Sequence, residues 1–530
     1  MRGLVFLLIG APVLAGALGT LVLSLAEPGL GAYARAVALP GLAQSLAATL
    51  ISGLGATLGA LLISVPLGLR AWRDARLRAA LAPVLALPHA ALALGLAFLL
   101  APSGWLARLV AAVVGWTLPP GVVTVGDPFG VTLMVGLILK EVPFLVLMTL
   151  SAASMVPALV QMCAGQALGH APGSVWRRAI WPQLLVQLRL PLAVTLAFSL
   201  SVADMALLLG PSHPPVLAVQ ILRLFTAPDP AQRPVAAALA VLLLAVMGAA
   251  MLLWRFAEPG FLHLLRLGPR QRELPVATLF LWLGALLLAG VVAVLGLWSL
   301  AARWPWPAAM PELGLQGWRG VHWLQPAWTT LTLGLAASGL ALLRAIALLE
   351  AADRAGRPLR IGALLLLPLL LPQIGFLPGL TTAFLWLGLP PGPIAVLWAE
   401  LLFTFPYALI VLAGPWQALD RAMLRSAASL GVGPWSCLWR VKLPLLARPI
   451  AAAAAVGFAV SVAQYLSVLL PGAGRVVTLA TEAVALASGA DRRAAAVMGL
   501  LQMLLPLLAY GAALAMPPRA PGLPRRGDDC

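Results

Sequence analysis

Four charged residues stand inside long apolar stretches of this 530-residue sequence: Lys140, Glu141, Asp204 and Glu400. A charge in such surroundings costs several kcal/mol unless it is paired or hydrated. These groups therefore indicate either a polar pathway for a solute or ion, or a buried structural pair such as Lys140 with Asp204. Neighbouring residues on a helix point about 100° apart, so Lys140 and Glu141 need not satisfy each other.

The sequence offers little support for catalytic chemistry. A nucleotide-binding Walker A loop needs a lysine followed by serine or threonine, whereas the two lysines, Lys140 and Lys442, precede Glu141 and Leu443. The five histidines are scattered without the spacing of metal ligands. We therefore expect a chain that is not an enzyme, holds no metal and binds no cofactor, so that any ATP it depends on is hydrolysed by a separate chain.

The composition places these residues in a membrane protein. Apolar residues make up 62% of the chain and charged residues only 10%, which is too little charge to cover the surface of a soluble protein. Basic residues outnumber acidic ones by 34 to 17, but they do not alternate with aromatics as in a nucleic-acid groove. We therefore expect an all-α polytopic membrane protein that contacts membrane lipids and no nucleic acid.

Hydropathy predicts about twelve transmembrane helices. They lie near residues 3–26, 46–69, 79–100, 129–154, 190–210, 234–256, 275–299, 328–350, 361–387, 391–414, 449–470 and 493–516. An N-terminus on the cytoplasmic side places 24 of the 34 basic residues in cytoplasmic segments and nine on the opposite face. This positive-inside bias predicts that both termini are cytoplasmic.

The two halves of the chain repeat each other in the same order. Matched segments are Val142-Pro143-Phe144 with Phe405-Pro406-Tyr407, Leu168-Gly169 with Leu430-Gly431, Pro182 with Pro444, and Ser201-Val202-Ala203-Asp204 with Ser461-Val462-Ala463-Gln464. The neutral Gln464 thus takes the position of Asp204. We expect two tandem six-helix repeats at residues 1–256 and 275–516, joined by a cytoplasmic linker at 257–274 and followed by a cytoplasmic tail at 517–530.

The longest cytoplasmic loop of each half, at residues 155–189 and 415–448, is predicted to contain two short helices. The first helix stops at Leu168-Gly169 or Leu430-Gly431, and the second runs from Pro172 to Pro182 or from Pro434 to Pro444. Large apolar side chains on the second helix are Trp176, Leu438 and Trp439. They suggest a docking surface for a partner protein. An interfacial helix with its tryptophans among lipid headgroups explains them equally well.

Both loops share one pattern: a Leu-Gly pair, then twelve residues, then a proline. This pattern resembles the EAA loop of type I binding-protein-dependent ABC importer permeases. The family pattern is Glu-Ala-Ala-x-x-x-Gly followed by Leu-Pro, and the second loop matches it well from Leu430 to Pro444. Arg425-Ser426-Ala427 and Cys163-Ala164-Gly165 stand where the family has Glu-Ala-Ala. Both glutamates of the pattern are therefore missing, and Trp181 replaces the leucine before Pro182.

The resemblance implies a permease subunit that forms the translocation pathway of an importer in the bacterial cytoplasmic (inner) membrane. Each loop would dock on one subunit of a cytoplasmic ABC ATPase homodimer, and ATP-driven closure of the ATPase would rock the two halves. A periplasmic or lipid-anchored substrate-binding protein would deliver the solute. The fused double length is most similar to thiamine and iron(III) permeases and their uncharacterised relatives, so the expected cargo is thiamine, iron(III) or another small solute.

An ion-coupled secondary transporter is the alternative function, with Glu141, Asp204 and Glu400 binding the coupling ion. Such a transporter needs no cytoplasmic docking loops, whereas this chain has two in register. A polytopic membrane enzyme would need a cluster of His, Asp or Glu near a membrane interface, and the sequence indicates none.

Overall fold

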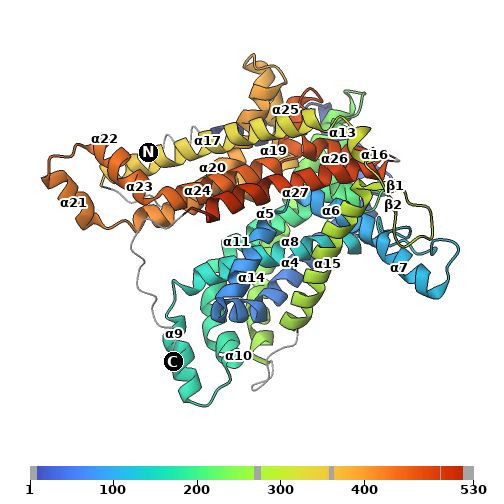
Figure 1. Ribbon diagram of the computed structural model, residues 1–530. Coiled ribbons are helices and arrows are strands. Elements are labelled where there is room, and N and C mark those ends of the chain that lie inside the picture. The colour runs from blue at the N-terminus through green and yellow to red at the C-terminus, as the bar shows by residue number, and fades with distance from the viewer. Residues whose placement is uncertain (1–8, 268–275, 357–362, 490, 517–530) are drawn as a thin grey trace.

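The structure, a computed structural model, describes residues 9–267, 276–356, 363–489 and 491–516. Helices form nearly all of the regular structure in these ranges (Figure 1). Within them, a small antiparallel sheet pairs β1 (Ala301–Arg303) with β2 (Glu312–Leu313). The predicted all-α polytopic fold is confirmed.

The helices of the first half are α2 (Ala11–Ser24), α3 (Gly31–Val37), α4 (Leu42–Arg73), α5 (Ala75–Ala86), α6 (His89–Leu100), α7 (Trp105–Val114), α8 (Val131–Ala153), α9 (Ala158–Ala167), α10 (Pro172–Val175), α11 (Trp181–Ser201), α12 (Asp204–Leu209), α13 (Leu217–Phe225) and α14 (Gln232–Leu267). Those of the second half are α15 (Val276–Ser299), α16 (Gln316–Arg319), α17 (Leu324–Arg354), α18 (Ala363–Leu370), α19 (Gln373–Trp386), α20 (Pro393–Gln417), α21 (Arg421–Ser429), α22 (Pro434–Cys437), α23 (Leu443–Leu445), α24 (Ala447–Val462), α25 (Leu466–Gly472), α26 (Leu479–Ala487) and α27 (Arg492–Leu514). Shorter turns are the 3-10 turn η2 (Pro28–Leu30) and the π-helical turns η3 (Trp176–Ile180) and η4 (Leu438–Lys442).

Within the described residues, nine helices are long and apolar enough to cross a membrane, or up to eleven if each of two bent helix pairs is one span. The predicted count of twelve is not confirmed. The predicted span near 361–387 is divided into α18 and α19 at Leu371-Pro372, and neither piece is long enough to cross alone. Proline interrupts the helix because it has no N–H and disfavours helical backbone at the residue before it. Leu87-Pro88 separates α5 from α6 in the same way.

The predicted linker at 257–274 is helical in its first part, because α14 continues through Pro259 to Leu267. Glu258 on this extension accepts hydrogen bonds from Arg189 of α11 at 2.8 and 3.1 Å and from Arg255 at 3.2 Å. These bonds fasten the extension to α11. The rest of the linker from residue 268, the tail at 517–530 and the N-terminal residues 1–8 lie outside the described residues, so the predicted side of the two termini is not tested.

The first helix of each half packs against the other half. α2 lies along α19, and α15 lies along α6. A Cβ added to Gly379 of α19 would overlap the Gly16 carbonyl oxygen and would lie 2.5 Å from the Thr20 nitrogen. Gly95 of α6 leaves as little room for a side chain next to Val291 of α15. Small residues let helices approach closely where lipid supplies no hydrophobic drive between them, so these two crossings bind the halves together.

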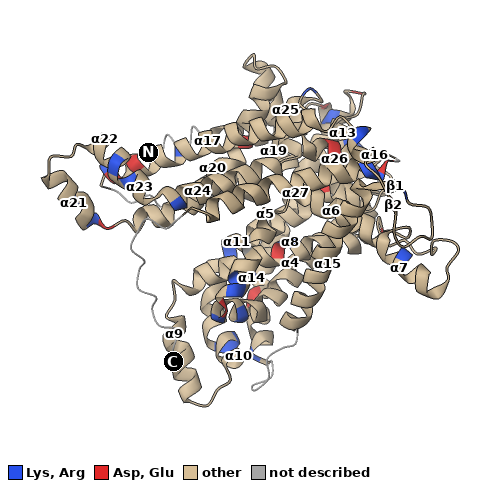
Figure 2. Ribbon diagram, viewed as in Figure 1, with Lys and Arg blue, Asp and Glu red and all other residues tan. Residues whose placement is uncertain are grey.

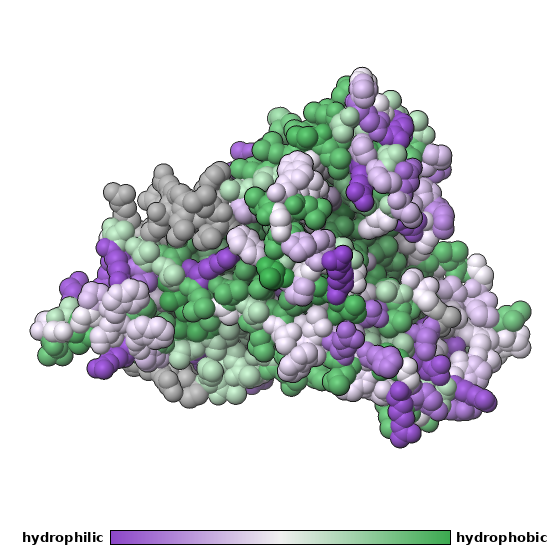
Figure 3. All heavy atoms as spheres, turned by 90° about the horizontal axis from the view of Figure 1, so that it is seen from above, coloured by the Kyte–Doolittle hydropathy of each residue, from purple (hydrophilic) through white to green (hydrophobic). Residues whose placement is uncertain are grey.

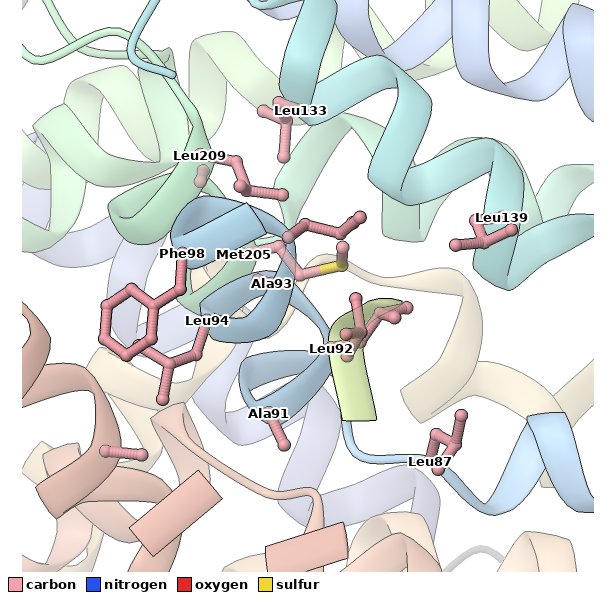
Figure 4. Close-up of a cluster of buried hydrophobic side chains, with 14 of the residues drawn as sticks. Leu87, Ala91, Leu92, Ala93, Leu94, Phe98, Leu133, Leu139, Met205 and Leu209 are labelled. Atoms are coloured by element: carbon pink, nitrogen blue, oxygen red, sulfur yellow. The ribbon is translucent and has the colours of Figure 1, made fainter. Parts of the chain in front are cut away.

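A central core surrounds α6. Every residue from Ala90 to Leu96 is buried, and Figure 4 shows side chains of this helix grouped with Leu133 of α8 and with Met205 and Leu209 of α12. A helix that is apolar on all sides must be enclosed by protein or lipid. Because α15 and α27 of the second half also pack on α6, this core belongs to both halves.

The outer surface suits a lipid environment. Much of the face seen in Figure 3 is hydrophobic, with most hydrophilic side chains toward its edges. Charged residues gather toward the ends of the long helices (Figure 2).

In Figure 1 the long helices of the two halves converge toward the end that carries β1 and β2, and diverge toward the end where α9–α10 and α21–α22 project.

Candidate functional site

The first predicted docking loop turns at its glycine. α9 ends at Ala167 with Leu168 as its C-cap, and Gly169 follows with φ of +78°. The N–H groups of Gly169 and His170 donate to the carbonyls of Gln166 and Gly165, at 2.9 and 3.0 Å. This pair of bonds is a Schellman motif, whose left-handed position favours glycine because it has no Cβ.

The second loop repeats the same backbone. α21 ends at Ser429 with Leu430 as its C-cap, and Gly431 follows with φ of +79°. The N–H groups of Gly431 and Val432 donate to the carbonyls of Ala428 and Ala427, at 3.0 and 3.1 Å. Matched residues therefore make matched turns in the two loops.

The second short helix of each loop begins at the predicted proline, but the two helices end differently from each other. Pro172 and Pro434 occupy the first turns of α10 and α22, and a π-helical turn follows each of them. The prediction that Pro182 ends the helix is wrong, because η3 runs directly into α11. The wider π turn before Pro182 gives its ring room beside the preceding turn. Pro444 does precede a break: α23 ends at Leu445, and α24 leaves at 77°.

The predicted docking surface is exposed only in part. Trp176 is fully buried and Leu438 is 5% exposed, so both face the protein interior and not a partner. The reason is that each short helix buries one face against the membrane helices behind it. Apolar side chains that do face solvent include Leu168, Leu430, Trp435 and Trp439. Trp435 is missing from the sequence prediction, although its spacing of four from Trp439 places the two on one helix face.

Tryptophan packing anchors the first loop. The indole nitrogen of Trp176 donates to the Val65 carbonyl of α4 at 2.8 Å. Its ring centroid lies 5.9 Å from that of Trp72 and 6.3 Å from that of Trp181. All of these residues belong to one apolar cluster. Burial and the Trp176 hydrogen bond therefore help to hold this loop against α4.

Charged groups anchor the second loop. Lys442 Nζ lies 2.6 Å from the Glu350 carboxylate and 2.8 Å from that of Asp353, both on the last turns of α17. Arg354 donates to Glu350 at 2.9 Å, and the Trp416 indole donates to Asp353 at 3.0 Å. No local sequence pattern indicates Glu350 or Asp353 as partners of Lys442, because the pairing joins residues 92 and 89 positions apart.

Lys140 lies among backbone carbonyls. Its Nζ donates to Val84 at 3.3 Å, Leu85 at 2.8 Å and Leu87 at 2.5 Å. These carbonyls belong to the end of α5 and to the break before α6. The suggested ion pair with Asp204 is absent from the described part of the chain, and the ammonium instead satisfies the interrupted helix.

Each of two buried glutamates accepts a hydrogen bond from a hydroxyl on a neighbouring helix. Glu141 of α8 accepts from Thr195 of α11 at 3.0 Å, and Glu400 of α20 accepts from Ser461 of α24 at 2.5 Å. The pairs α8–α11 and α20–α24 are equivalent in the repeat, but the two acids do not occupy matched positions. Each carboxyl group therefore ties two membrane helices together within its own half.

Asp204 and Gln464 lie at the starts of equivalent short helices. Asp204 is the first residue of α12, where the helix dipole favours an acid. Gln464 precedes α25, and its Oε1 accepts a hydrogen bond from Ser467 at 2.6 Å. The predicted polar residues thus lie on three helices and one helix start: Lys140 and Glu141 on α8, Asp204 on α12, Glu400 on α20, and Gln464 just before α25. In the described ranges no three His, Cys, Asp or Glu residues form a group that could hold a metal ion.

Two known permeases resemble this chain, one of them over most of its length. The inner membrane ABC transporter permease protein YnjC of Escherichia coli (strain K12) is 34% identical over 442 residues, which cover 82% of this chain and 80% of YnjC. The molybdenum transport system permease protein ModB of Azotobacter vinelandii is 32% identical over 125 residues, which cover 21% of this chain and 55% of ModB. No protein-family model matches the chain. The match to YnjC is too long to fall within one half of the repeat.

Proposed function

This chain belongs to the ABC transporter permeases of the inner membrane, and from that premise we propose that it forms the translocation pathway of an importer driven by a separate ATPase. It is a multi-pass transport subunit. Its fused, double-length form supplies both halves of the pathway from one chain. Both termini and both docking loops face the cytoplasm in this proposal, in line with the positive-inside bias.

The matched backbones of the two loops carry the proposal. Each loop presents a short helix beyond a glycine turn, as a pair of equal ATPase subunits requires. In the second loop Leu430, Trp435 and Trp439 supply exposed apolar and aromatic anchors for a cleft on the partner. In the first loop Leu168 is the matching exposed anchor. We name residues 155–189 and 415–448 the first and second coupling loops.

Rocking of the two halves supplies the transport step. ATP binding closes the ATPase dimer and draws the coupling loops together, and the halves then turn about the crossings of α2 with α19 and α15 with α6. The long helices of the two halves diverge toward the loop end in Figure 1, so the two loops project separately from the rest of the chain. ATP is used by the partner, and this chain binds no cofactor of its own.

A small solute is the proposed cargo, delivered by a periplasmic or lipid-anchored substrate-binding protein. The named relative ModB belongs to a molybdenum transport system, and the double length resembles thiamine and iron(III) permeases. Thiamine, iron(III) and small oxyanions are therefore the first solutes to test.

Co-purification tests the proposal. The tagged full-length chain is produced with the ABC ATPases of its own organism and purified in detergent, and an ATPase is expected to be retained at two subunits per chain. In proteoliposomes, the cognate binding protein is expected to raise ATP hydrolysis. Uptake driven by a proton or sodium gradient, with no ATPase retained, would instead establish the ion-coupled transporter.

A further inference from the structure

The two coupling loops rest on membrane helices that can be aligned residue by residue. Thr49 of α4 accepts the N–H of Leu217 at 2.8 Å, and Thr330 of α17 accepts the N–H of Leu479 at 2.9 Å. These two bonds join matched elements of the repeat. They therefore fix which residue of α4 corresponds to which residue of α17.

On this alignment, three positions that hold the loops are apolar in the first half and charged in the second. Leu69, Trp72 and Ile180 correspond to Glu350, Asp353 and Lys442. The first three belong to one apolar cluster. In the second half, Lys442 and Glu350 are buried and ion-paired. The same mechanical connection is thus built from packing in one loop and from an ion cluster in the other.

The loops also differ in how they continue into the membrane. Pro172–Ser201 is one helix of 30 residues, so a displacement of the first loop passes directly along α11. The second loop is separated from α24 by a bend of 77°, which cannot transmit an axial push in the same way. The second loop is instead joined to a membrane helix by the ion pairs of Lys442 with Glu350 and Asp353 at the end of α17.

The ion cluster also reaches the exposed docking surface. The guanidinium of Arg354 lies 4.2 Å from the ring centroid of Trp435 and donates to Glu350. Lys442, Arg354, Glu350 and Asp353 carry two positive and two negative charges, so the cluster is balanced while all four are present. Among the described residues, removal of Lys442 leaves the buried Glu350 with the partly exposed Arg354 as its one ionic partner.

We propose that Lys442 is a positioning residue that transmits movement of the second coupling loop into α17, whereas the first loop transmits its movement into α11. This inference rests on the proposed function, since it assumes that an ATPase moves the loops. It assigns the two loops unequal mechanical routes through the membrane.

Amide hydrogen exchange tests the two routes without knowledge of the cargo. In the free chain, Lys442→Met is expected to speed exchange in residues 434–445 by about tenfold or more, while residues 172–180 stay unchanged. In the complex with the ATPase, trapping with ATP and vanadate is expected to alter exchange in residues 341–354 of the wild-type chain. Lys442→Met is expected to keep ATPase protection of α22 but to lose the response of residues 341–354.

Three variants control the experiment. Arg440→Met removes an equal charge from an exposed site on the same π turn and is expected to behave as wild type. Lys442→Arg keeps a charged donor and is expected to preserve most of the α17 response. If Lys442→Met does not fold, Lys442→Met combined with Glu350→Met removes the partner charge and serves in its place.

Persistence of the α17 response in Lys442→Met would overturn the inference, as would its loss in Arg440→Met. A wild-type chain that binds no ATPase would overturn the proposed function instead. In that case, faster exchange of residues 434–445 in Lys442→Met would still support the anchoring role of the ion cluster. The two proposals therefore fail in distinguishable ways.

Discussion

The ammonium nitrogen of Lys140 lies 2.5 Å from the carbonyl oxygen of Leu87, the residue just before the proline that separates α5 from α6. Val84 and Leu85 accept from the same nitrogen. Water is scarce at this depth, so the carbonyls of an interrupted helix need donors from the protein. An ammonium group supplies three, and Lys140 thereby lets the chain bend between two membrane helices.

Lys140→Met should destabilise the protein by about 2–5 kcal/mol, because it leaves buried carbonyls without a donor. The expected observation is a lower midpoint of thermal unfolding for the detergent-purified protein. Lys140→Arg keeps charged donors and should lose less. An unchanged midpoint in Lys140→Met would show that the break between α5 and α6 does not depend on this side chain.

The long membrane helices follow closely from the sequence. α8, α15 and α20 begin and end within a few residues of the predicted spans. An apolar segment in lipid must satisfy its own backbone N–H and C=O groups, and a single segment can do so only as a helix. Breaks at Leu87-Pro88 and Leu371-Pro372 are harder to predict, since prolines also stand inside α8 and α20 without ending them. Whether a proline breaks a helix depends on which neighbours satisfy the freed carbonyls.

The candidate site is predictable in its turns and not in its contacts. Glycine followed by proline at fixed spacing predicts the shape of both loops, because positive φ and a first-turn proline are local requirements. The burial of Trp176 and the pairing of Lys442 with Glu350 depend on helices distant in sequence. No local pattern encodes them, so one exposed tryptophan was expected where the structure has a buried one.

Gly379→Ala tests the crossing of the first helix with the second half. The new Cβ would overlap backbone of α2 at Gly16 and Thr20, so the helices must separate at a cost of about 1–3 kcal/mol. A lower unfolding midpoint is the expected result. Gly375→Ala is a matched control on the same helix, because its nearest neighbours are 3.6 Å away. It should be neutral or slightly stabilising, and equal losses in both variants would contradict the crossing.

Cysteine labelling tests the orientation of the chain. In a background without the natural cysteines, Val113→Cys on α7 should react with a membrane-impermeant maleimide added outside intact cells. Leu430→Cys in the second coupling loop should react only after the cells are opened. Both wild-type side chains lie at the protein surface, 87% and 83% exposed, so burial within the protein does not account for a difference in labelling. The reverse pattern would invert the topology.

Asp204 and Gln464 should respond unequally to substitution. Asp204→Ala removes the acid from the first turn of α12 and should cost about 1 kcal/mol of stability. Gln464→Glu should be less harmful, because a protonated carboxyl group carries no charge and its carbonyl oxygen can still accept the Ser467 hydroxyl. Gln464→Leu leaves that hydroxyl unsatisfied and should cost about 1–3 kcal/mol. Unfolding midpoints of the three variants provide the comparison, and full stability in Asp204→Ala would remove any structural role for this acid.

Gly431→Val tests the coupling function most directly. The backbone of Gly431 has φ of +79° and open space around it, so valine meets no clash and suffers only the strain of a left-handed conformation, roughly 1–2 kcal/mol. That strain should displace α22 from its docking position and weaken ATPase binding by about tenfold. Gly431→Asp should act in the same direction by placing a charge at the exposed turn.

Gly433→Ala is the matched control, because Gly433 has φ of −64° and equally open surroundings. Membrane insertion should stay normal in every variant, since no membrane helix is altered. Gly169→Val, in the matched turn of the first loop, should weaken binding through the other ATPase subunit, and the double variant should lose the ATPase on purification. Undiminished ATPase recovery from the double variant would remove the coupling assignment of both loops.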